Sequence, residues 1–399
     1  MSGSNISVFL FWVGVNGTFY AYLGFPAVIS FLAAMKRKKG ERSVPDEGRG
    51  GLTQTISIII PAFNEENVIG TKIRNVLSSD YPLQFLDVIV VSDDSSDRTD
   101  EIARTFEKDG VRLIVQETRR GKTAGLNRAI ELAKGEIVVF TDANAIYPAD
   151  AILKMSRYFD NPNVGLVTGY TKYTMAEDGN VTEATNAYTA LERLLKRAES
   201  EWGCCVGADG AIFTMRKSLY RTLREDDIND FVIPLGVIDQ GYQCVFAEDA
   251  YCSENSGKNI ESEFRRQSRI TNRTLRAVWR YRHLLNPFRF PSYSFFLFSH
   301  KVVRFLVPVF IILSVGALAF LAPRGGAYLV VGVAASLSIA MAALSNVVPS
   351  IASPRFPTGR AVRFLGIFLT INLAVLHGWW KFISGRRDVM WQHDRSAGK

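Results

Sequence analysis

The sequence predicts an α/β domain built on a mostly parallel sheet, with membrane-associated helices before and after it. Two short β-branched runs, Val88–Val91 and Ile137–Phe140, each end in acidic residues, about 50 positions apart. Uninterrupted apolar runs of this kind are typical of parallel strands that are buried on both faces. Open α/β sheets bind ligands at the carboxyl ends of such strands. The pattern therefore predicts that several acids gather at one edge of the sheet.

Strands and helices are expected to alternate through the central part of the chain. The first strand is expected at 56–60, ending at Pro61, and the first helix from Asn64 to Leu77. Further strands are expected at 88–91, 111–115 and 137–140, and further helices at 97–108, at 122–134 before Gly135, and at 184–201. This alternation at short spacing predicts βαβ units and a mostly parallel sheet.

Apolar stretches flank the domain. Residues 6–34 carry no charge, and these 29 residues exceed the ~20 that a membrane-spanning helix needs. The basic run 36–39 follows at once, which predicts that this end lies in the cytoplasm. Three later apolar stretches lie at 305–322, 328–348 and 364–380. Three crossings there would leave Arg386 and Arg387 outside, against the same rule, so one late stretch is expected to lie in the interface or to re-enter.

These features define the expected domains. They are an N-terminal transmembrane helix (1–35), a basic and polar linker (36–52), a cytosolic catalytic domain (53–260), basic and aromatic interfacial helices (261–297), a C-terminal transmembrane bundle (298–385) and a polar tail (386–399). The net charge of +8 comes largely from residues beside the apolar segments. Anionic lipid is therefore expected as the partner, and nucleic acid is not. The expected location is the cytoplasmic membrane.

The acids after the second run are candidate metal ligands. Asp142 and Asn144 stand two positions apart after a strand, so both side chains can reach one divalent ion. Hard oxygen ligands suit Mg²⁺ or Mn²⁺, which would bridge a diphosphate. An Asx turn that ends the strand is the structural alternative.

Four further groups have a chemical and a structural interpretation. Asp93 either binds a base and ribose or caps the next helix together with Asp97. Lys122, at a helix start after Gly121, either meets phosphate or is a solvated turn residue. Asp230 either accepts a proton from a sugar hydroxyl or caps a helix. Arginines 265, 266 and 269 either clamp a diphosphate or face lipid.

Taken in order, these segments resemble the family 2 glycosyltransferases, and specifically the membrane-integrated group that includes polysaccharide synthases. The similar segments are 57–66 (SIIIPAFNEE), 90–99 (VVSDDSSDRT), 121–127 (GKTAGLN), 140–144 (FTDAN), 207–211 (GADGA) and 229–231 (NDF). The resemblance runs from about Thr55 to Arg304. It implies a GT-A type, Rossmann-like fold and an inverting, metal-dependent transfer from a nucleotide-diphosphate sugar, with a UDP-sugar as the expected donor.

The resemblance also implies roles for individual residues. Asp93 would contact the uridine, and Asp142 would hold Mg²⁺ or Mn²⁺ with help from Asn144. Asp230 would be the catalytic base. The remaining nucleotide contacts would come from Pro61, Asn64, Glu65, Lys122 and Asp142, the diphosphate contacts from Arg266 and Arg269, and the acceptor contacts from Gly207 and Asp209. A single displacement needs one base and no enzyme nucleophile.

The chain departs from the family pattern at two positions. Asn144 replaces the usual aspartate, which lowers the expected metal affinity or routes the second contact through water. Ile270 replaces the tryptophan that would stack on an acceptor sugar. The leading hypothesis is extension of an exopolysaccharide, capsule or lipid-linked glycan. The alternatives are transfer of one sugar to polyprenyl phosphate, which Ile270 favours, and a non-catalytic subunit of a synthesis complex, which Asn144 favours. A homo-oligomer or a synthesis-complex partner is compatible with each hypothesis.

Overall fold

A computed structural model describes residues 3–39, 54–174, 179–255, 260–347 and 357–388 of the protein. Its sheet has seven strands in the order β3-β2-β1-β4-β6-β5-β7. The strands are β1 (Ile56–Ala62), β2 (Leu86–Ser92), β3 (Arg112–Val115), β4 (Ile137–Thr141), β5 (Val164–Thr174), β6 (Ile212–Arg216) and β7 (Gln243–Asn255). Most of the linker expected at 36–52 and of the tail expected at 386–399 lies outside the described residues.

The sheet is mixed and mostly parallel, as the sequence predicts. Strand β1 pairs in parallel with β2 and β4, and β2 with β3. Strand β6 is antiparallel to both of its neighbours, and β5 is parallel to β7. Because β1, β2 and β4 run the same way, the residues that follow them meet at one edge. That edge receives Asn64, Asp93 and Asp142.

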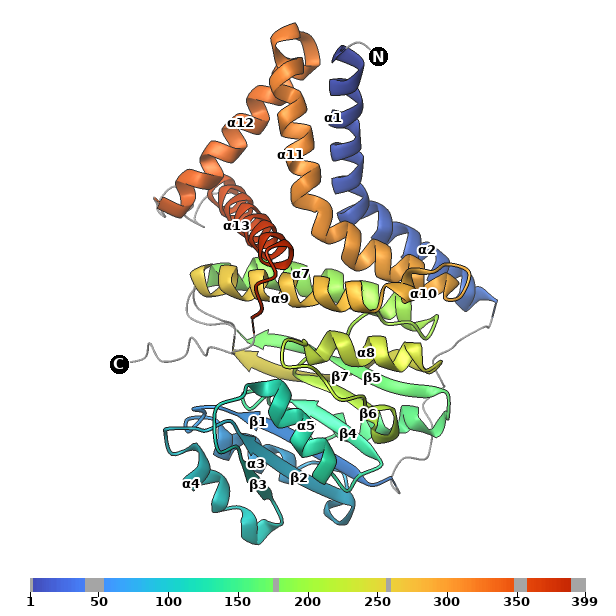
Figure 1. Ribbon diagram of the computed structural model, residues 1–399, viewed down its shortest axis with the longest axis vertical. Helices are drawn as coiled ribbons and strands as arrows, with labels where there is room; N and C mark the ends of the chain where they lie inside the picture. The colour runs from blue at the N-terminus through green and yellow to red at the C-terminus, as the bar shows by residue number, and fades with distance from the viewer. Residues whose placement is uncertain (1–2, 40–53, 175–178, 256–259, 348–356, 389–399) are drawn as a thin grey trace.

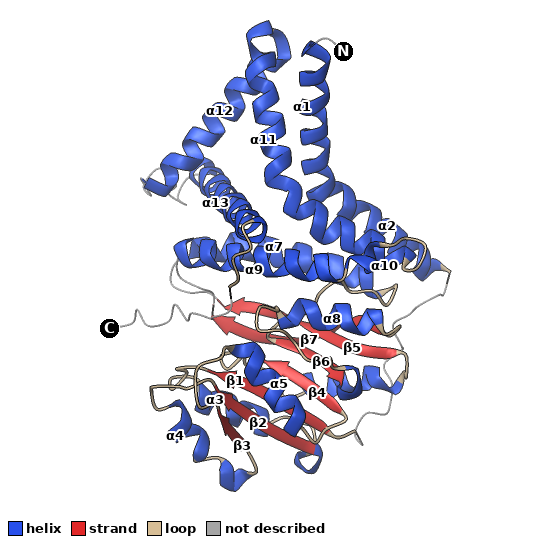
Figure 2. Cartoon of the chain, viewed as in Figure 1, coloured by secondary structure: helices blue, strands red, loops and turns tan. Residues whose placement is uncertain are grey.

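Helices cover both faces of the sheet (Figures 1 and 2). Side chains alternate along each strand, so Ile58 and Ile60 of β1 pack on one face with α3, α4 and α6, and Ile59 packs on the other with α5 and α8. These helices are α3 (Ile69–Leu77), α4 (Thr99–Arg104), α5 (Lys122–Leu132), α6 (Ala151–Ser156) and α8 (Asn229–Asp239).

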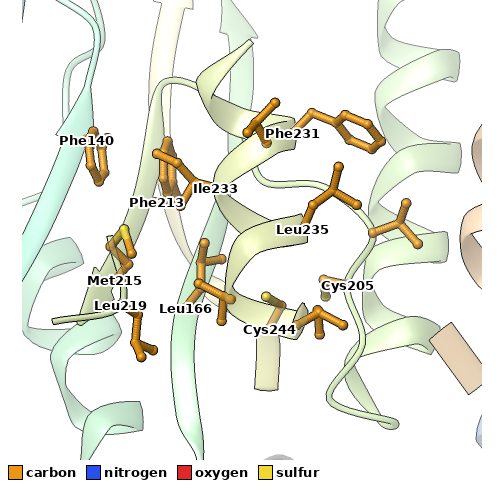
Figure 3. Close-up of a cluster of buried hydrophobic side chains, with 14 of the residues drawn as sticks. Phe140, Leu166, Cys205, Phe213, Met215, Leu219, Phe231, Ile233, Leu235 and Cys244 are labelled. Carbon is orange, nitrogen blue, oxygen red and sulfur yellow. The ribbon is translucent and has the colours of Figure 1, made fainter. Parts of the chain in front are cut away.

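The second of these faces holds a core in which α8 packs on β4, β5 and β6 (Figure 3). Phe140 and Phe213 stack there with ring centroids 4.7 Å apart. Ile233 and Leu235 of α8 lie over this face. The residues at the start of α8 are therefore held against the sheet.

Helices α7 (Gly179–Ser200), α9 (Ile260–Arg280) and α10 (Pro291–Leu297) form a layer between the sheet and the apolar helices (Figure 1). Buried polar contacts join α7 to the start of the next apolar helix. Glu199 of α7 accepts hydrogen bonds at two oxygens: Oε1 is 2.6 Å from His300 Nδ1, and Oε2 is 3.1 Å from the backbone N of Val206. One carboxylate thus contacts both the apolar helices and the loop after α7.

Two local expectations were wrong at their boundaries. The first helix begins at Ile69, because Asn64 has a left-handed φ of 54°. Helix α5 ends at Leu132 and not at Gly135. A Cβ on Gly135 would lie 2.3 Å from the backbone N of Ser57, so this glycine allows the chain to approach β1 closely.

In the described part of the chain, four helical segments are long and apolar enough to cross a membrane: Asn5–Lys38, Pro291–Arg324, Gly326–Leu344 and Ala361–Ile383. The second segment begins with α10. The other helices that contribute to the four segments are α1 (Gly3–Phe19), α2 (Phe25–Lys38), α11 (Val303–Leu321), α12 (Gly326–Val347) and α13 (Pro357–Ile383). A π-helical turn at Tyr20–Gly24 joins α1 to α2, and another at Phe298–Val302 joins α10 to α11. Phe25 and Ile29 of α2 are buried in the core of the domain.

The last helix accounts for the topology conflict in the sequence. Asn272 Nδ2 and Arg276 Nη2 of α9 donate to the carbonyl oxygen of Arg386, at 3.0 and 2.8 Å. The chain after α13 therefore returns to the domain side, which three full crossings would not allow. Helix α13 packs on α9, and a Cβ on Gly378 would lie 2.6 Å from Thr271 Cβ. We infer that α13 follows the interfacial layer and does not complete a crossing.

This topology predicts which cysteine variants react from the same side of a membrane. In sealed vesicles, we expect Ser384→Cys and Lys134→Cys to behave alike toward a membrane-impermeant maleimide. Either both cysteines react or both are protected. Pro323→Cys, in the turn between α11 and α12 at the tip far from the sheet, should show the opposite behaviour. The unmodified protein gives the background from its four free cysteines. If Ser384→Cys behaves like Pro323→Cys, the assignment of α13 is wrong.

Candidate active site

The candidate site centres on Lys122 and Asp142. Lys122 is the first residue of α5, and its Nζ lies 2.5 Å from Oδ1 of Asp142, which follows β4. Burial lowers the pKa of Lys122, but the Asp142 carboxylate outweighs burial and the pKa is raised overall. Lys122 thus stays charged at neutral pH. The structure places its ammonium on the predicted metal ligand, where it balances the charge of the acidic edge.

Asp230 belongs to the same group of charges. It lies in the first turn of α8, and its Oδ1 is shielded from solvent with no hydrogen-bond partner in the described part of the chain. Burial raises the pKa of Asp230, Lys122 opposes this, and the negative charge of Asp209 raises the pKa further. A carboxylate with a raised pKa and an open acceptor atom is suited to take up a proton.

The loop at 207–211 is built around Asp230. Ala208 donates its backbone N–H to the carbonyl oxygen of Asp230, at 2.8 Å. A Cβ on Gly210 would lie 3.0 Å from Asp230 Oδ2, so a side chain at this position would crowd the carboxylate. Gly207 has more room, with 3.8 Å from such a Cβ to Asp230 O. The loop therefore sits directly against the candidate base.

Asp209 uses its carboxylate within the fold. Its oxygens accept from the backbone N and the hydroxyl of Thr171 on β5, at 2.9 and 2.8 Å, and from the backbone N of Ala211, at 3.2 Å. These bonds fix the loop to the sheet. The acceptor contact expected for Asp209 remains a prediction. Its hydrogen bonds also stabilise the loop at 207–211.

Asp93 also bonds to its own surroundings. Its carboxylate accepts from Gln116 Nε2 at 2.7 Å, from the backbone N of Arg120 at 2.8 Å and from the backbone N of Gly121 at 2.9 Å. These donors lie in the loop that leads to Lys122. Asp93 therefore holds the approach to α5. Asp97 accepts from the backbone N of Thr99, the first residue of α4, at 3.0 Å.

The expected nucleotide contacts Pro61, Asn64 and Glu65 lie near the end of β1 or just after it. Pro61 lies within β1, beyond the last residue that pairs with β4. Asn64 Oδ1 accepts from the backbone N of Ser96 at 2.8 Å, which joins the loops after β1 and β2. Glu65 is buried, and its backbone N donates to Thr99 Oγ1 at 2.8 Å. The structure brings these three residues to the same edge as Asp93.

The predicted diphosphate clamp lies on α9. Arg266 pairs with Glu263 one turn earlier, with Nη1 and Oε2 3.1 Å apart. Burial raises the pKa of Tyr173, at the end of β5, and Arg266 opposes this increase. Arg266 is thus within electrostatic range of the sheet edge. Burial and the neighbouring positive charge of Arg269 lower the pKa of Arg273 to about 10.

Lys72 was not predicted from the sequence, and its side chain contacts the loop that follows Asp142. This fully buried side chain of α3 donates from Nζ to the carbonyl oxygen of Ala145 at 2.6 Å, and Nζ lies 3.8 Å from the centroid of the Tyr147 ring. Burial lowers the pKa of Lys72 to about 7. A lysine on the apolar face that Ile69, Ile73 and Val76 define was the available signal.

The donor set at Asp142 and Asn144 fits a hard divalent cation. It offers one carboxylate and one amide oxygen directly after a strand. Among the described residues no cluster of three or more His, Cys, Asp or Glu could enclose a metal. Mg²⁺ is commonly bound by one or two carboxylates together with substrate phosphates and water, which matches this incomplete set. Asp142 and Asn144 would hold the cation, and Asp142 would then be shared with Lys122.

The fold and these residues define the class of the domain. Residues 57–224 match the model of the family described as "Glycosyl transferase family 2". This region, less than half of the chain, is therefore similar to the glycosyl transferase family 2 domain. The sheet and its flanking helices have the GT-A type fold, and all of the predicted segments up to the loop at 207–211 lie inside the matched region.

Particular relatives add detail. The chain is 29% identical over 186 residues to poly-beta-1,6-N-acetyl-D-glucosamine synthase of Staphylococcus epidermidis, covering 46% of this chain and 45% of that protein. It is 30% identical over 141 residues to beta-monoglucosyldiacylglycerol synthase of Trichormus variabilis, covering 34% and 30%. The matches thus span less than half the length of either relative.

A solved structure resembles nearly the whole chain. It is the mannosyltransferase PcManGT from Pyrobaculum calidifontis in complex with GDP-Man and Mn²⁺, with a TM-score of 0.70 and 22% identity. The similarity covers 95% of this chain and 100% of that one. It therefore shows that the arrangement of sheet and apolar helices is shared.

The contacts of Asp93 predict a structural effect that does not need a nucleotide. Asp93→Ala leaves three donors without an acceptor, so we expect a loss of stability of about 1–3 kcal/mol and faster tryptic cleavage at Arg119 and Arg120. Asp93→Asn keeps one acceptor oxygen and should lose less. Glu101→Ala, whose carboxylate is largely exposed, is the control. Unchanged melting and cleavage in Asp93→Ala would contradict this role.

Proposed function

We propose that the protein is a membrane-bound, inverting glycosyltransferase that moves a sugar from a nucleotide-diphosphate donor to a glycan or lipid-linked acceptor. A UDP-sugar is the expected donor, and Mg²⁺ or Mn²⁺ the expected cofactor. The observation that carries the proposal is the shared charge centre at the sheet edge. Lys122 contacts Asp142 and is also within electrostatic range of Asp230, so the proposed metal ligand and the proposed base both lie near one cation.

The chemistry follows from this arrangement. An acceptor hydroxyl oxygen attacks the anomeric carbon of the donor, and its proton passes to Asp230. The bond between the anomeric carbon and the diphosphate oxygen breaks, and the nucleoside diphosphate leaves with the electron pair. When bound, the divalent cation offsets the charge that builds on this diphosphate. Lys122 adds a second positive charge, and Arg266 and Arg269 are the proposed further donors to phosphate oxygens.

The acceptor and location are proposed on separate grounds. The two relatives are named as a polymer synthase and a glycolipid synthase, so both a growing glycan and a lipid acceptor are supported. Ile270 lies on α9 and offers no aromatic face, which favours transfer of a single sugar to a lipid phosphate as the second candidate. The basic residues that end α2 support a cytosolic domain at the cytoplasmic membrane. Partner subunits or a second copy remain compatible with this proposal.

The proposal is tested by donor turnover. We expect purified, detergent-solubilised protein to release nucleoside diphosphate from one member of a panel of nucleotide sugars in the presence of Mn²⁺ or Mg²⁺. In the Asp142→Ala protein, we expect the metal affinity and the rate of nucleoside diphosphate release each to fall at least tenfold. Asp230→Asn should bind the donor normally but lose about 10²–10⁴-fold of the transfer rate. Glu101→Ala is the matched surface control.

The outcomes separate the hypotheses. Full transfer activity in the Asp230→Asn protein would exclude Asp230 as the base. A ladder of product lengths indicates polymer synthesis, and a single product indicates transfer of one sugar. No release from any donor, with membrane lipid and acceptors added, would contradict the enzymatic proposal and favour the non-catalytic subunit.

Asp230 predicts a specific pH dependence. The base must be ionised, so activity falls as the pH falls through its pKa, which is raised above the ordinary value mainly by burial. Lys196 of α7 lowers that pKa. We therefore expect Lys196→Gln to move the acidic limb of the kcat/KM profile to higher pH. Arg197→Gln removes an exposed charge from the next position and should leave the limb in place. An acidic limb at the same pH in the wild-type, Lys196→Gln and Arg197→Gln proteins would contradict the assignment of Asp230 as the base.

A further inference from the structure

A cavity of about 210 Å³ lies between the loop at 219–227, α8 and the end of α9, and its lining does not include Asp142. Its floor is apolar and includes Leu223, Val232 and Ile233. Three arginines, Arg221, Arg224 and Arg280, also line it, against one acid, Asp227. The volume is below the roughly 300–1,000 Å³ of pockets for drug-sized ligands, so a small group fits and a whole nucleotide sugar does not.

A helical glycine keeps this cavity open. Gly236 lies inside α8, where glycine is less favourable than alanine. A Cβ built on it would point at Tyr281 Oη and Arg221 Cδ, at 3.8 and 4.0 Å, which are ordinary contact distances. Close packing therefore does not require glycine here. Its effect is to leave space beside the arginines.

Arg224 and Arg280 have side-chain N–H groups that are available to a ligand. Arg224 makes no ion pair with any residue that the structure describes, although its backbone takes part in the loop. Arg280 Nη2 lies 2.5 Å from Asp227 Oδ1, while its buried Nε has no hydrogen-bond partner within the described ranges. A buried guanidinium donor without an acceptor is costly. Arg221 pairs with Asp239, with Nη1 and Oδ2 2.7 Å apart. Among the described residues, the cationic donors that remain for a ligand are therefore those of Arg224 and the unused Nε of Arg280.

The cavity is also coupled to the candidate base. Asp227 lies three residues before Asp230, in the loop that leads into α8. Its carbonyl oxygen accepts from Thr123 Oγ1 of α5 at 3.3 Å and from Arg273 Nη1 of α9 at 3.4 Å. An anion that binds Arg280 would share it with Asp227. Binding in the cavity would thus act on the loop that leads to the base.

We propose that this cavity is a binding site for a single phosphate group, from free phosphate or from an anionic lipid headgroup, separate from the donor site. The planar donors of Arg224 and Arg280 match phosphate oxygens, and the space beside Gly236 admits the group. This inference does not depend on the proposed transfer reaction.

The test measures binding of inorganic phosphate to the full-length protein with EDTA present and without donor, at constant ionic strength. We expect saturable binding by calorimetry and a rise in melting temperature with phosphate concentration. Gly236→Leu fills the cavity and should weaken binding at least tenfold. Arg224→Gln should do the same without adding bulk, and it keeps the test valid if the leucine variant does not fold.

Two controls and a lipid arm complete the design. Arg128→Gln removes an exposed arginine of α5, and Asp142→Ala alters the donor site; both should keep wild-type phosphate affinity. In nanodiscs, weaker phosphate binding with phosphatidylglycerol than with phosphatidylcholine alone identifies the lipid headgroup as the occupant, and equal binding identifies free phosphate. The proposal is overturned if wild-type protein shows no saturable binding, or if Gly236→Leu and Arg224→Gln both bind phosphate normally.

Discussion

The ion pair between Lys122 and Asp142 is the constraint on which the rest of the candidate site depends. Parallel strands bring the residues after β1, β2 and β4 to one edge, and that edge is rich in carboxylates. Such a concentration of negative charge needs cations close by. Lys122 supplies such a cation by pairing with Asp142. Lys72, whose pKa burial lowers to about 7, holds the loop that follows Asp142 from the interior through the carbonyl oxygen of Ala145. The acids can therefore stay together before any metal binds.

The loops around this centre are held by the same residues that were expected to contact substrate. Asp93 fixes the approach to Lys122, Asn64 joins two strand ends, and Asp209 fastens its loop to β5. A side chain that is already bonded loses little conformational entropy when a ligand arrives. Pre-organisation of this kind is compatible with both a structural and a binding role, and it explains why the two interpretations could not be separated from sequence.

Much of the fold could be predicted because its signals are local. Uninterrupted β-branched runs located β1, β2 and β4, and their order indicated the mostly parallel sheet. The start of α3 was misplaced because a left-handed Asn64 looks like an ordinary helix cap in sequence. Lys72 was overlooked because its partner, the carbonyl oxygen of Ala145, is 73 positions away. The course of α13 depends on contacts with α9, and hydropathy carries no information about them.

The carboxylate of Glu199 joins two parts of the protein that solubilisation affects differently. One oxygen faces His300, in the turn that leads into α11, and the other holds Val206, which begins the loop beside Asp230. The strand ends that carry Asp93 and Asp142 have no such direct link to the apolar helices among the described contacts. A detergent that loosens α11 would therefore disturb the loop beside Asp230 before the strand ends that carry Asp93 and Asp142. For the proposed transferase, donor hydrolysis would then survive extraction better than sugar transfer, and the ratio of the two rates would report how native the surrounding bilayer is.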